Sequence, residues 1–175
     1  MIEKNDVGNI CHEHIEFYSL KSLKFLFEKN GLEIFRIEEN DINGGSYRIY
    51  CRKFKKGSIR LKKENVLKLM KSFVRRVKKN KLDTMRFIKS KIKKGKKVYL
   101  YGASTKGNTV LQYYGLDHKK IQFGAERSPE KWGKYTIGTG IKIISEKMAR
   151  RLNPDFFFVT PWGFAKEFIK RERKW

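Results

Sequence analysis

The feature that most constrains the fold of this chain is a short apolar run that leads into a glycine loop and then into a helical pattern. The run is Val98–Tyr101, and the loop extends from Gly102 to Gly107. After this loop, short apolar segments alternate with segments of helical spacing. Strands that alternate with helices are typical of a parallel sheet covered by helices. We therefore expect residues 95–175 to form an α/β domain.

The expected elements of this domain follow from its apolar runs and its helical spacing. Strands are predicted over residues 98–101, 121–125, 141–144 and 155–160. Helices are predicted over residues 108–114, 145–152 and 163–171.

The first third of the chain has a different pattern. Ser19 can cap a helix over residues 20–30, and Gly31 can end it. Residues 32–37 and 46–54 alternate as strands do, and the turn chemistry of residues 40–45 predicts that they pair like a hairpin. This segment is small for an independent core, so we interpret it as the tail of a larger domain.

A long basic segment connects the two parts. Its apolar residues recur every three or four positions from Val66 to Ile92, which predicts one amphipathic helix or two helices separated near Asn80. The apolar stripe could serve a membrane surface or a partner helix, but packing on its own neighbouring domain is the commoner arrangement. No apolar run approaches the ~20 residues that span a bilayer, and the first residues lack the apolar segment of a signal peptide. We expect a cytoplasmic protein with no membrane partner.

The charge is strongly positive. The 42 Lys and Arg residues outnumber the 18 Asp and Glu residues, which gives a net charge of +24. A net charge of this size creates a positive electrostatic field, which favours partners that carry phosphate. Because the lysines are spread through nearly every segment, we expect nucleic acid to bind only non-specifically. A non-catalytic basic protein that binds polyanions or RNA is nevertheless the alternative function.

The glycine loop fits two known phosphate-binding loops imperfectly. The loop for nucleoside triphosphates needs Lys followed by Ser or Thr after its last glycine, where this chain has Asn108. The dinucleotide loop needs a central glycine, where this chain has Ser104. Free N–H groups at a helix start, the hydroxyls of Ser104 and Thr105 and the ammonium of Lys106 would still make an anion site suited to a diphosphate. A structural turn capped by Ser104 is the alternative.

An acidic residue follows the second predicted strand of this domain. Glu126 lies about where a ribose-binding acid is found in doubly wound folds, at an expected offset of ~20 residues.

Residues 11–14, Cys-His-Glu-His, concentrate groups that bind metals or carry protons. Zinc would need further ligands, and His118 and Cys51 are the remaining histidine and cysteine of the chain, so we predict no metal site. A thiol nucleophile would need a base beside Cys11. The histidines suit a general base, and a structural polar loop is equally compatible with these residues.

Four motifs, in this order along the chain, resemble the C-terminal portion of S-adenosylmethionine-dependent sugar C-methyltransferases. They occupy residues 11–19, 44–48, 101–109 and 127–135. The resemblance runs from about residue 7 to residue 173. It implies that residues 1–58 are the remnant of a class I methyltransferase domain, that residues 59–94 are a helical connector, and that residues 95–175 are a Rossmann-like C-terminal domain.

The resemblance also implies a reaction and a set of site residues. Its members methylate a carbon of a ketosugar, typically C3, on a sugar linked to a nucleoside diphosphate. His14 would act as the general base that gives an enolate, with Glu13 beside it. The residues that would bind the nucleotide part of the substrate are Gly102, Ser104, Thr105, Lys106, Gly107, Asn108, Arg127 and Tyr135.

The chain departs from the family pattern in several places. Cys11, Asn43 and Gly163 stand where members often have a tyrosine and two histidines. The chain also contains neither the glycine-rich cofactor loop nor the cysteine cluster of the family. We therefore predict that S-adenosylmethionine is the cofactor of the full-length enzyme, that it does not bind this chain alone, and that the chain is an inactive fragment or a subunit that works with a separate cofactor-binding chain.

Overall fold

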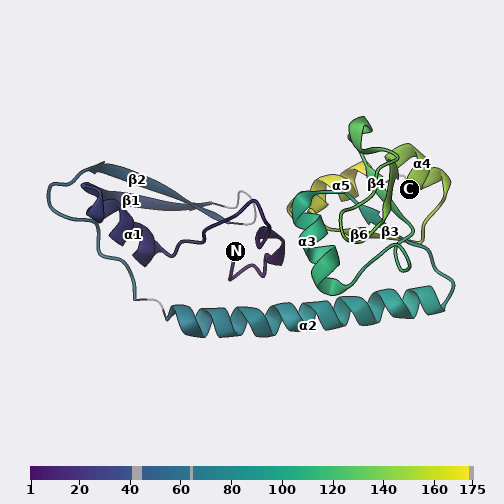
Figure 1. Ribbon diagram of the computed structural model, residues 1–175, viewed down its shortest axis with the longest axis horizontal. Coiled ribbons are helices and arrows are strands. Elements are labelled where there is room, and N and C mark those ends of the chain that lie inside the picture. Colours follow the sequence, from purple (N-terminus) through teal and green to yellow (C-terminus); the bar gives the residue numbers. More distant parts are fainter. Residues whose placement is uncertain (41–44, 64, 174–175) are drawn as a thin grey trace. The chain divides into compact units, whose positions relative to one another are not determined.

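The computed structural model describes residues 1–40, 45–63 and 65–173, which form two compact units. The first unit contains Met1–Asp6 and His12–Arg75, and the second contains Val7–Cys11 and Arg76–Trp175. Helix α2 (Val66–Lys93) is continuous through Asn80 (Figure 1). The first of the two predicted arrangements, a single amphipathic helix, is therefore confirmed. None of the helices in the described part of the chain is both long and apolar enough to cross a membrane.

The first unit contains helix α1 (Leu20–Lys29) and the antiparallel strands β1 (Leu32–Asn40) and β2 (Ser46–Lys53), as predicted. The hydroxyl of Ser19 accepts a hydrogen bond from the Ser22 N–H at 3.1 Å and caps α1. Gly31, with φ of +73°, lets the chain turn directly from α1 into β1. The predicted turn between the strands falls largely on residues 41–44, which lie outside the described residues.

A buried carboxylate organises the chain after β2. The side chain of Glu33 is fully buried and accepts hydrogen bonds from the N–H groups of Lys55, Lys56 and Gly57 at 3.0, 2.8 and 2.6 Å. The Nε of Arg52 donates a fourth bond at 2.6 Å. These donors, the Lys55 N–H first among them, lower the pKa of Glu33 to about 2. The ionised carboxylate therefore holds the turn that follows β2.

The second unit is built on a four-stranded parallel sheet. Its strands are β3 (Val98–Tyr101), β4 (Phe123–Glu126), β5 (Lys142–Ser145) and β6 (Phe156–Val159). Their order in the sheet is β5-β4-β3-β6, and each neighbouring pair is parallel. This order and the crossover helices define a Rossmann-like sheet, which confirms the predicted fold class.

Helices cover both faces of this sheet. They are α3 (Thr105–Tyr114), α4 (Glu146–Arg151) and α5 (Ala165–Arg171), together with the C-terminal part of α2. Leu100 of β3 packs with Ile88 of α2 and Leu111 of α3 on one face. Tyr101 packs with Ala149 of α4 and Phe168 of α5 on the other. Adjacent strand residues point to opposite faces, so β3 contributes to both cores, and Figure 1 shows the strands between α3 and α4.

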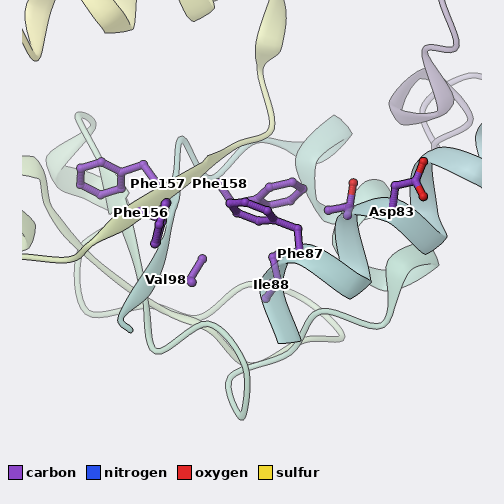
Figure 2. Close-up of a pocket in the computed structure, with 8 residues that line it drawn as sticks. Asp83, Phe87, Ile88, Val98, Phe156, Phe157 and Phe158 are labelled. Atoms are coloured by element: carbon purple, nitrogen blue, oxygen red, sulfur yellow. The ribbon is translucent and has the colours of Figure 1, made fainter. Parts of the chain in front are cut away.

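An apolar groove lies where α2 meets the edge strand β6. Phe87 of α2 and Phe156 of β6 meet edge to face with their ring centroids 5.6 Å apart. Figure 2 shows Ile88 of α2 and Val98 of β3 at the same groove. The ammonium of Lys91 lies 4.9 Å from the centroids of both aromatic rings, which is a cation–π distance. These contacts hold the C-terminal part of α2 against the sheet.

Candidate functional site

The candidate site lies at the carboxyl end of β3, where the order of the sheet reverses. The chain places β4 and β5 on one side of β3 and then returns to place β6 on the other side. In open α/β sheets, ligands bind outside the carboxyl ends of the strands at such a reversal. The glycine loop that follows β3 and the residues Thr160 and Pro161 that follow β6 therefore flank the position where a ligand is expected.

The two glycines of the loop allow the chain after β3 to approach the chain after β6. Gly102 has φ of +83°, and a Cβ at this position would lie 2.7 Å from Cγ of Pro161. A Cβ at Gly107 would overlap Oγ1 of Thr160 and lie 3.1 Å from Oγ of Ser104. Oγ1 of Thr160 in turn donates a hydrogen bond to the Gly102 carbonyl at 3.0 Å. The spacing of these glycines thus serves close backbone packing at the reversal point.

The loop ends at the start of α3, which begins at Thr105 rather than at the predicted Asn108. The reason is that Ser104 acts as the N-cap and its hydroxyl accepts the Gly107 N–H at 3.1 Å. Within the described part of the chain, the N–H groups of Ser104, Thr105 and Lys106 meet no acceptor. Unpaired N–H groups at a helix start and a neighbouring ammonium favour an anion. Part of the predicted substrate site is therefore gathered at one helix start.

Asn108 is placed differently from its neighbours. Its N–H donates to the Ser104 carbonyl at 2.9 Å, as a residue of the first helical turn does. Its side-chain Oδ1 is buried and meets no donor within the described residues. A buried acceptor without a donor costs about 1–3 kcal/mol, so this oxygen is a place where a donor from a ligand would stabilise the protein.

Glu126, at the end of β4, is bonded to its own chain. Its Oε2 accepts the Ala103 N–H at 2.9 Å, and its Oε1 accepts the N–H groups of Arg127 and Ser128 at 2.8 and 3.1 Å. The ammonium of Lys131 lies 3.7 Å from Oε2 and donates to the Ala103 carbonyl at 3.1 Å. The carboxylate thus connects the β3–α3 loop to the β4–β5 loop. The sequence predicted Glu126 at the position of a ribose-binding acid, and it did not reveal these contacts.

Arg127 and Tyr135 have different positions relative to the loop. Arg127 follows β4 directly, so it starts from the carboxyl edge of the sheet beside the glycine loop, and its side chain is exposed. Tyr135 pairs with Lys142 at the amino end of the edge strand β5 and is 60% exposed. Because the strands are parallel, the amino end of β5 lies at the opposite edge of the sheet from the loop. This geometry brings Arg127, but not the backbone of Tyr135, to the candidate site.

His14 and Glu13 belong to the first unit and are exposed. The ring of His14 meets the ring of Phe17 edge to face at 6.2 Å between centroids. Within the described residues, no three side chains of the types that bind metals lie together. Cys11, the first residue of the Cys-His-Glu-His segment, is buried and belongs to the second unit together with the 3-10 helix η1 (Val7–Asn9), which packs on α3.

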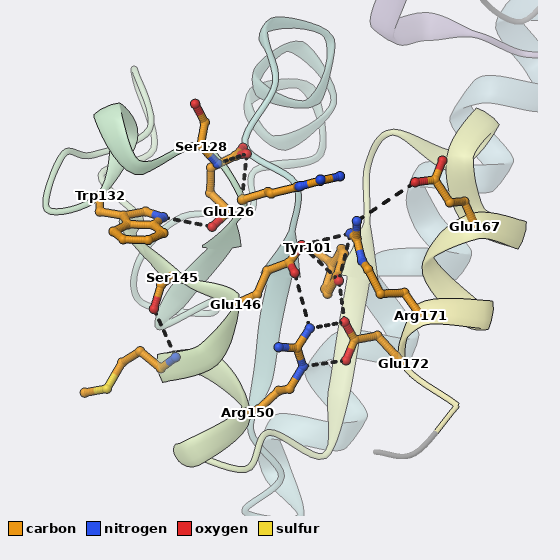
Figure 3. A network of polar contacts seen from close by, with 12 residues as sticks. Tyr101, Glu126, Ser128, Trp132, Ser145, Glu146, Arg150, Glu167, Arg171 and Glu172 are labelled. Atoms are coloured by element: carbon orange, nitrogen blue, oxygen red, sulfur yellow. Dashed lines mark hydrogen bonds and ion pairs between the residues drawn. The ribbon is translucent and has the colours of Figure 1, made fainter.

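A polar network on the face of the sheet that α4 and α5 cover was not predicted. The hydroxyl of Tyr101 lies 2.5 Å from Oε1 of Glu172, and Arg171 donates to this hydroxyl at 3.0 Å (Figure 3). Arg150 donates two hydrogen bonds to Glu172 at 2.7 and 2.6 Å and one to Glu146 at 3.2 Å. Burial, and then the hydrogen bond to Glu172, raise the pKa of Tyr101. The network fastens α5 and α4 to β3. Two i,i+4 pairs, Glu146–Arg150 on α4 and Glu167–Arg171 on α5, were the signals of it in the sequence.

The fold and the site together define a class of protein: a doubly wound, Rossmann-like unit whose first β–α loop ends at a helix start with unpaired N–H groups. A family model described as the C-methyltransferase C-terminal domain matches residues 41–175. The chain belongs to this family, and the resemblance drawn from the four motifs is confirmed at that level.

Among curated proteins, the chain is similar to the C-methyltransferase NovU of Streptomyces niveus. The two are 30% identical over 186 residues. The match covers 99% of this chain and 44% of that protein, so the chain spans less than half the length of this relative.

Proposed function

We propose that this chain is part of an S-adenosylmethionine-dependent C-methyltransferase whose substrate is a ketosugar linked to a nucleoside diphosphate. The loop Gly102–Asn108 holds the diphosphate, and His14 removes a proton from C3 of the sugar. The observation that carries the proposal is the set of unpaired N–H groups of Ser104, Thr105 and Lys106 at the reversal point of the sheet. The chain that carries them is a member of the C-methyltransferase C-terminal domain family. A diphosphate offers the acceptor oxygens and the negative charge that these groups lack.

Each part of the loop has a role in this proposal. The N–H groups of Ser104, Thr105 and Lys106 donate to phosphate oxygens, and the Lys106 ammonium balances their charge. Gly102 and Gly107 keep side chains out of the space between the loop and β6. Asn108 and Arg127 supply further contacts at the same edge of the sheet, and Tyr135 would have to reach the substrate by another route.

His14 supplies the proton chemistry. A C–H bond beside a carbonyl is acidic because the electron pair left behind is delocalised into the carbonyl as an enolate. The imidazole of His14 takes the proton, and the C3 carbon of the enolate becomes the nucleophile that C-methylation requires. An imidazole suits this task because its unperturbed pKa of ~6.5 lies near working pH. Glu13, directly before it, is the acidic neighbour that would help to hold the imidazolium.

Glu126 does not offer the free acceptor that the methyl donor would need beside the glycine loop. S-adenosylmethionine carries an adenosine whose ribose needs an acceptor, and the acidic residue beside the glycine loop, Glu126, already accepts three N–H groups. We therefore assign the donor to a cofactor-binding segment or chain beyond residues 1–175. The apolar surface of α1 is consistent with such a partner, because α1 has no buried residue and Phe25 is 67% exposed.

Calorimetry with the whole chain tests the diphosphate site. UDP and dTDP should both bind, and Lys106→Ala should weaken both by about tenfold or more, since hydrogen bonds to charged groups contribute ~1.5–3 kcal/mol. Lys147→Ala is the matched control, because it removes the same charge from an exposed position on α4. Equal affinities for the two variants would remove the phosphate assignment.

Proton exchange tests His14 without the methyl donor. With a nucleoside-diphosphate ketosugar in D₂O, NMR should show loss of the C3 proton signal, and His14→Gln should slow this loss by about 10²- to 10⁴-fold. His12→Gln, in the same exposed segment, should leave the exchange unchanged. With labelled S-adenosylmethionine added, the chain alone should transfer no methyl group, and robust transfer would contradict the assignment of the donor to a separate segment.

A further inference from the structure

The carboxylate of Glu126 has little acceptor capacity left for a ligand. A carboxylate offers about four lone-pair positions. Three of them receive N–H groups at 2.8 to 3.1 Å, and the ammonium of Lys131 lies 3.7 Å from Oε2. The side chain is 13% exposed. Ribose hydroxyls could reach it only by displacing the backbone of its own chain.

The donors to this carboxylate come from two different loops. Ala103 lies in the loop after β3, whereas Arg127 and Ser128 lie in the loop after β4. Figure 3 shows Ser128 and Trp132 on the same side of the sheet as Glu126, and the Trp132 indole donates to the Glu126 carbonyl at 2.9 Å. Lys131 adds a second link, because it donates to the Ala103 carbonyl. Ala103 is therefore held at both its N–H and its C=O, by Glu126 at the end of β4 and by Lys131 in the segment that follows.

We infer that Glu126 is a positioning residue for the diphosphate loop and not a ribose ligand. By bonding the Ala103 N–H, it orients the peptide units that follow, so that the N–H groups of Ser104, Thr105 and Lys106 face one anion. By bonding the Arg127 N–H, it sets the point from which the Arg127 side chain starts. This inference rests on the proposed diphosphate site, and it implies that the loop recognises the diphosphate without reading the 2′-hydroxyl of the nucleoside through Glu126.

A pair of nucleotides that differ only in the 2′-hydroxyl separates the two roles. In Glu126→Gln one carboxylate oxygen becomes an NH₂ group, which faces N–H donors and bonds none of them. A positioning role predicts that UDP and 2′-deoxyuridine diphosphate lose affinity by the same factor, about tenfold. The ratio of their dissociation constants then stays at its wild-type value. A selective loss of UDP binding, with the deoxynucleotide unaffected, would overturn the inference in favour of a ribose ligand.

Amide hydrogen exchange of the nucleotide-free protein supplies the second readout. Glu126→Gln should speed exchange at the N–H groups of the two loops, and Glu126→Asp should speed it mainly at Ala103, because the shorter side chain still reaches its near neighbours. The effect should be about tenfold, as expected when a hydrogen bond to a charged group is lost. Glu130→Gln is the matched control, since Glu130 is an exposed acid of the same segment that accepts only from the Ser128 hydroxyl at 2.6 Å within the described residues. Unchanged exchange at Ala103 in both Glu126 variants would also overturn the inference.

The two experiments distinguish the inference from the proposal beneath it. If the wild-type chain binds neither nucleotide, the proposed function fails, and the exchange rates at Ala103 still decide whether Glu126 holds the loop. If both nucleotides bind and exchange is unchanged in the variants, the diphosphate site stands and the positioning role falls.

Discussion

Gly107→Ala tests the close packing between the loop proposed to bind the diphosphate and the end of β6. Gly107 lies in the first turn of α3, where a Cβ would overlap Oγ1 of Thr160 and lie 3.0 Å from its Cβ. The oxygen cannot simply move away, because it donates to the Gly102 carbonyl at 3.0 Å. The new methyl group must therefore push α3 away from the end of β6 or break this hydrogen bond.

The expected cost follows from three contributions. Overpacking a tight site costs about 1–3 kcal/mol. Loss of the Thr160 hydrogen bond adds about 1 kcal/mol. Replacing glycine by alanine within a helix returns about 1 kcal/mol. The net loss of unfolding free energy is therefore about 1–3 kcal/mol, and nucleotide affinity should fall with it because the loop shifts.

Urea unfolding followed by circular dichroism measures this loss, with an unchanged m-value as the sign that the unfolded state is unaffected. Gly163→Ala is the matched control, because a Cβ at Gly163 meets nothing within 4 Å. Thr160→Ala in the Gly107→Ala background should recover part of the loss, whereas Thr160→Ser, which keeps the oxygen, should recover much less. A Gly107→Ala protein as stable as the Gly163→Ala control would refute this reasoning, as would equal rescue by the serine and alanine variants.

Three further predictions concern the charged groups. The pKa of Glu33 is lowered to about 2 from 4.5, so its ionised form stabilises the protein above pH 4.5, and this contribution is lost as the pH falls from 4.5 towards 2. The stability difference between wild type and Glu33→Gln in urea titrations should shrink over that pH range, and a constant difference would contradict the buried ionised carboxylate. Tyr101→Phe removes the hydroxyl that joins Arg171 to Glu172, and it should lower the unfolding free energy by about 1–3 kcal/mol, with faster proteolysis at α5. RNA binding should fall by about 10² between 50 and 200 mM salt if some five phosphates are contacted, with no preference among sequences, and a preferred sequence at the higher salt would favour the RNA-binding alternative.

Several elements could be predicted from local sequence because local interactions decide them. The α1 helix follows from the Ser19 cap and the spacing of its leucines, and its capping box is present in the structure. The strands β3 and β6 follow from short apolar runs. All four residues of β3 are buried, because a central strand covered on both faces needs apolar residues at every position, whereas the edge strand β6 is half-buried. The start of α3 was predicted three residues late, since the cap of Ser104 outweighed the low helix propensity of Gly107.

The site was predicted less completely. The glycine spacing indicated a tight loop, but the same spacing cannot tell which partner the glycines approach. Pro161 and Thr160 meet Gly102 and Gly107 only because β6 returns beside β3. The Tyr101 network likewise joins residues up to 71 positions apart, and no local period encodes such pairs.

By itself, the sequence determined the class of the second unit and the tight glycine loop before α3, because strand length, glycine spacing and helix caps are local properties of the polymer. The family of the chain was indicated by the resemblance of four motifs in their order along the chain. Only the tertiary structure decided that Glu126 bonds the Ala103 peptide, that Tyr135 lies by the amino end of β5, and that Val7–Cys11 packs with the second unit. The physical reason is that strand order brings distant groups within hydrogen-bonding distance, and a carboxylate bonds the donors that this order places nearest to it.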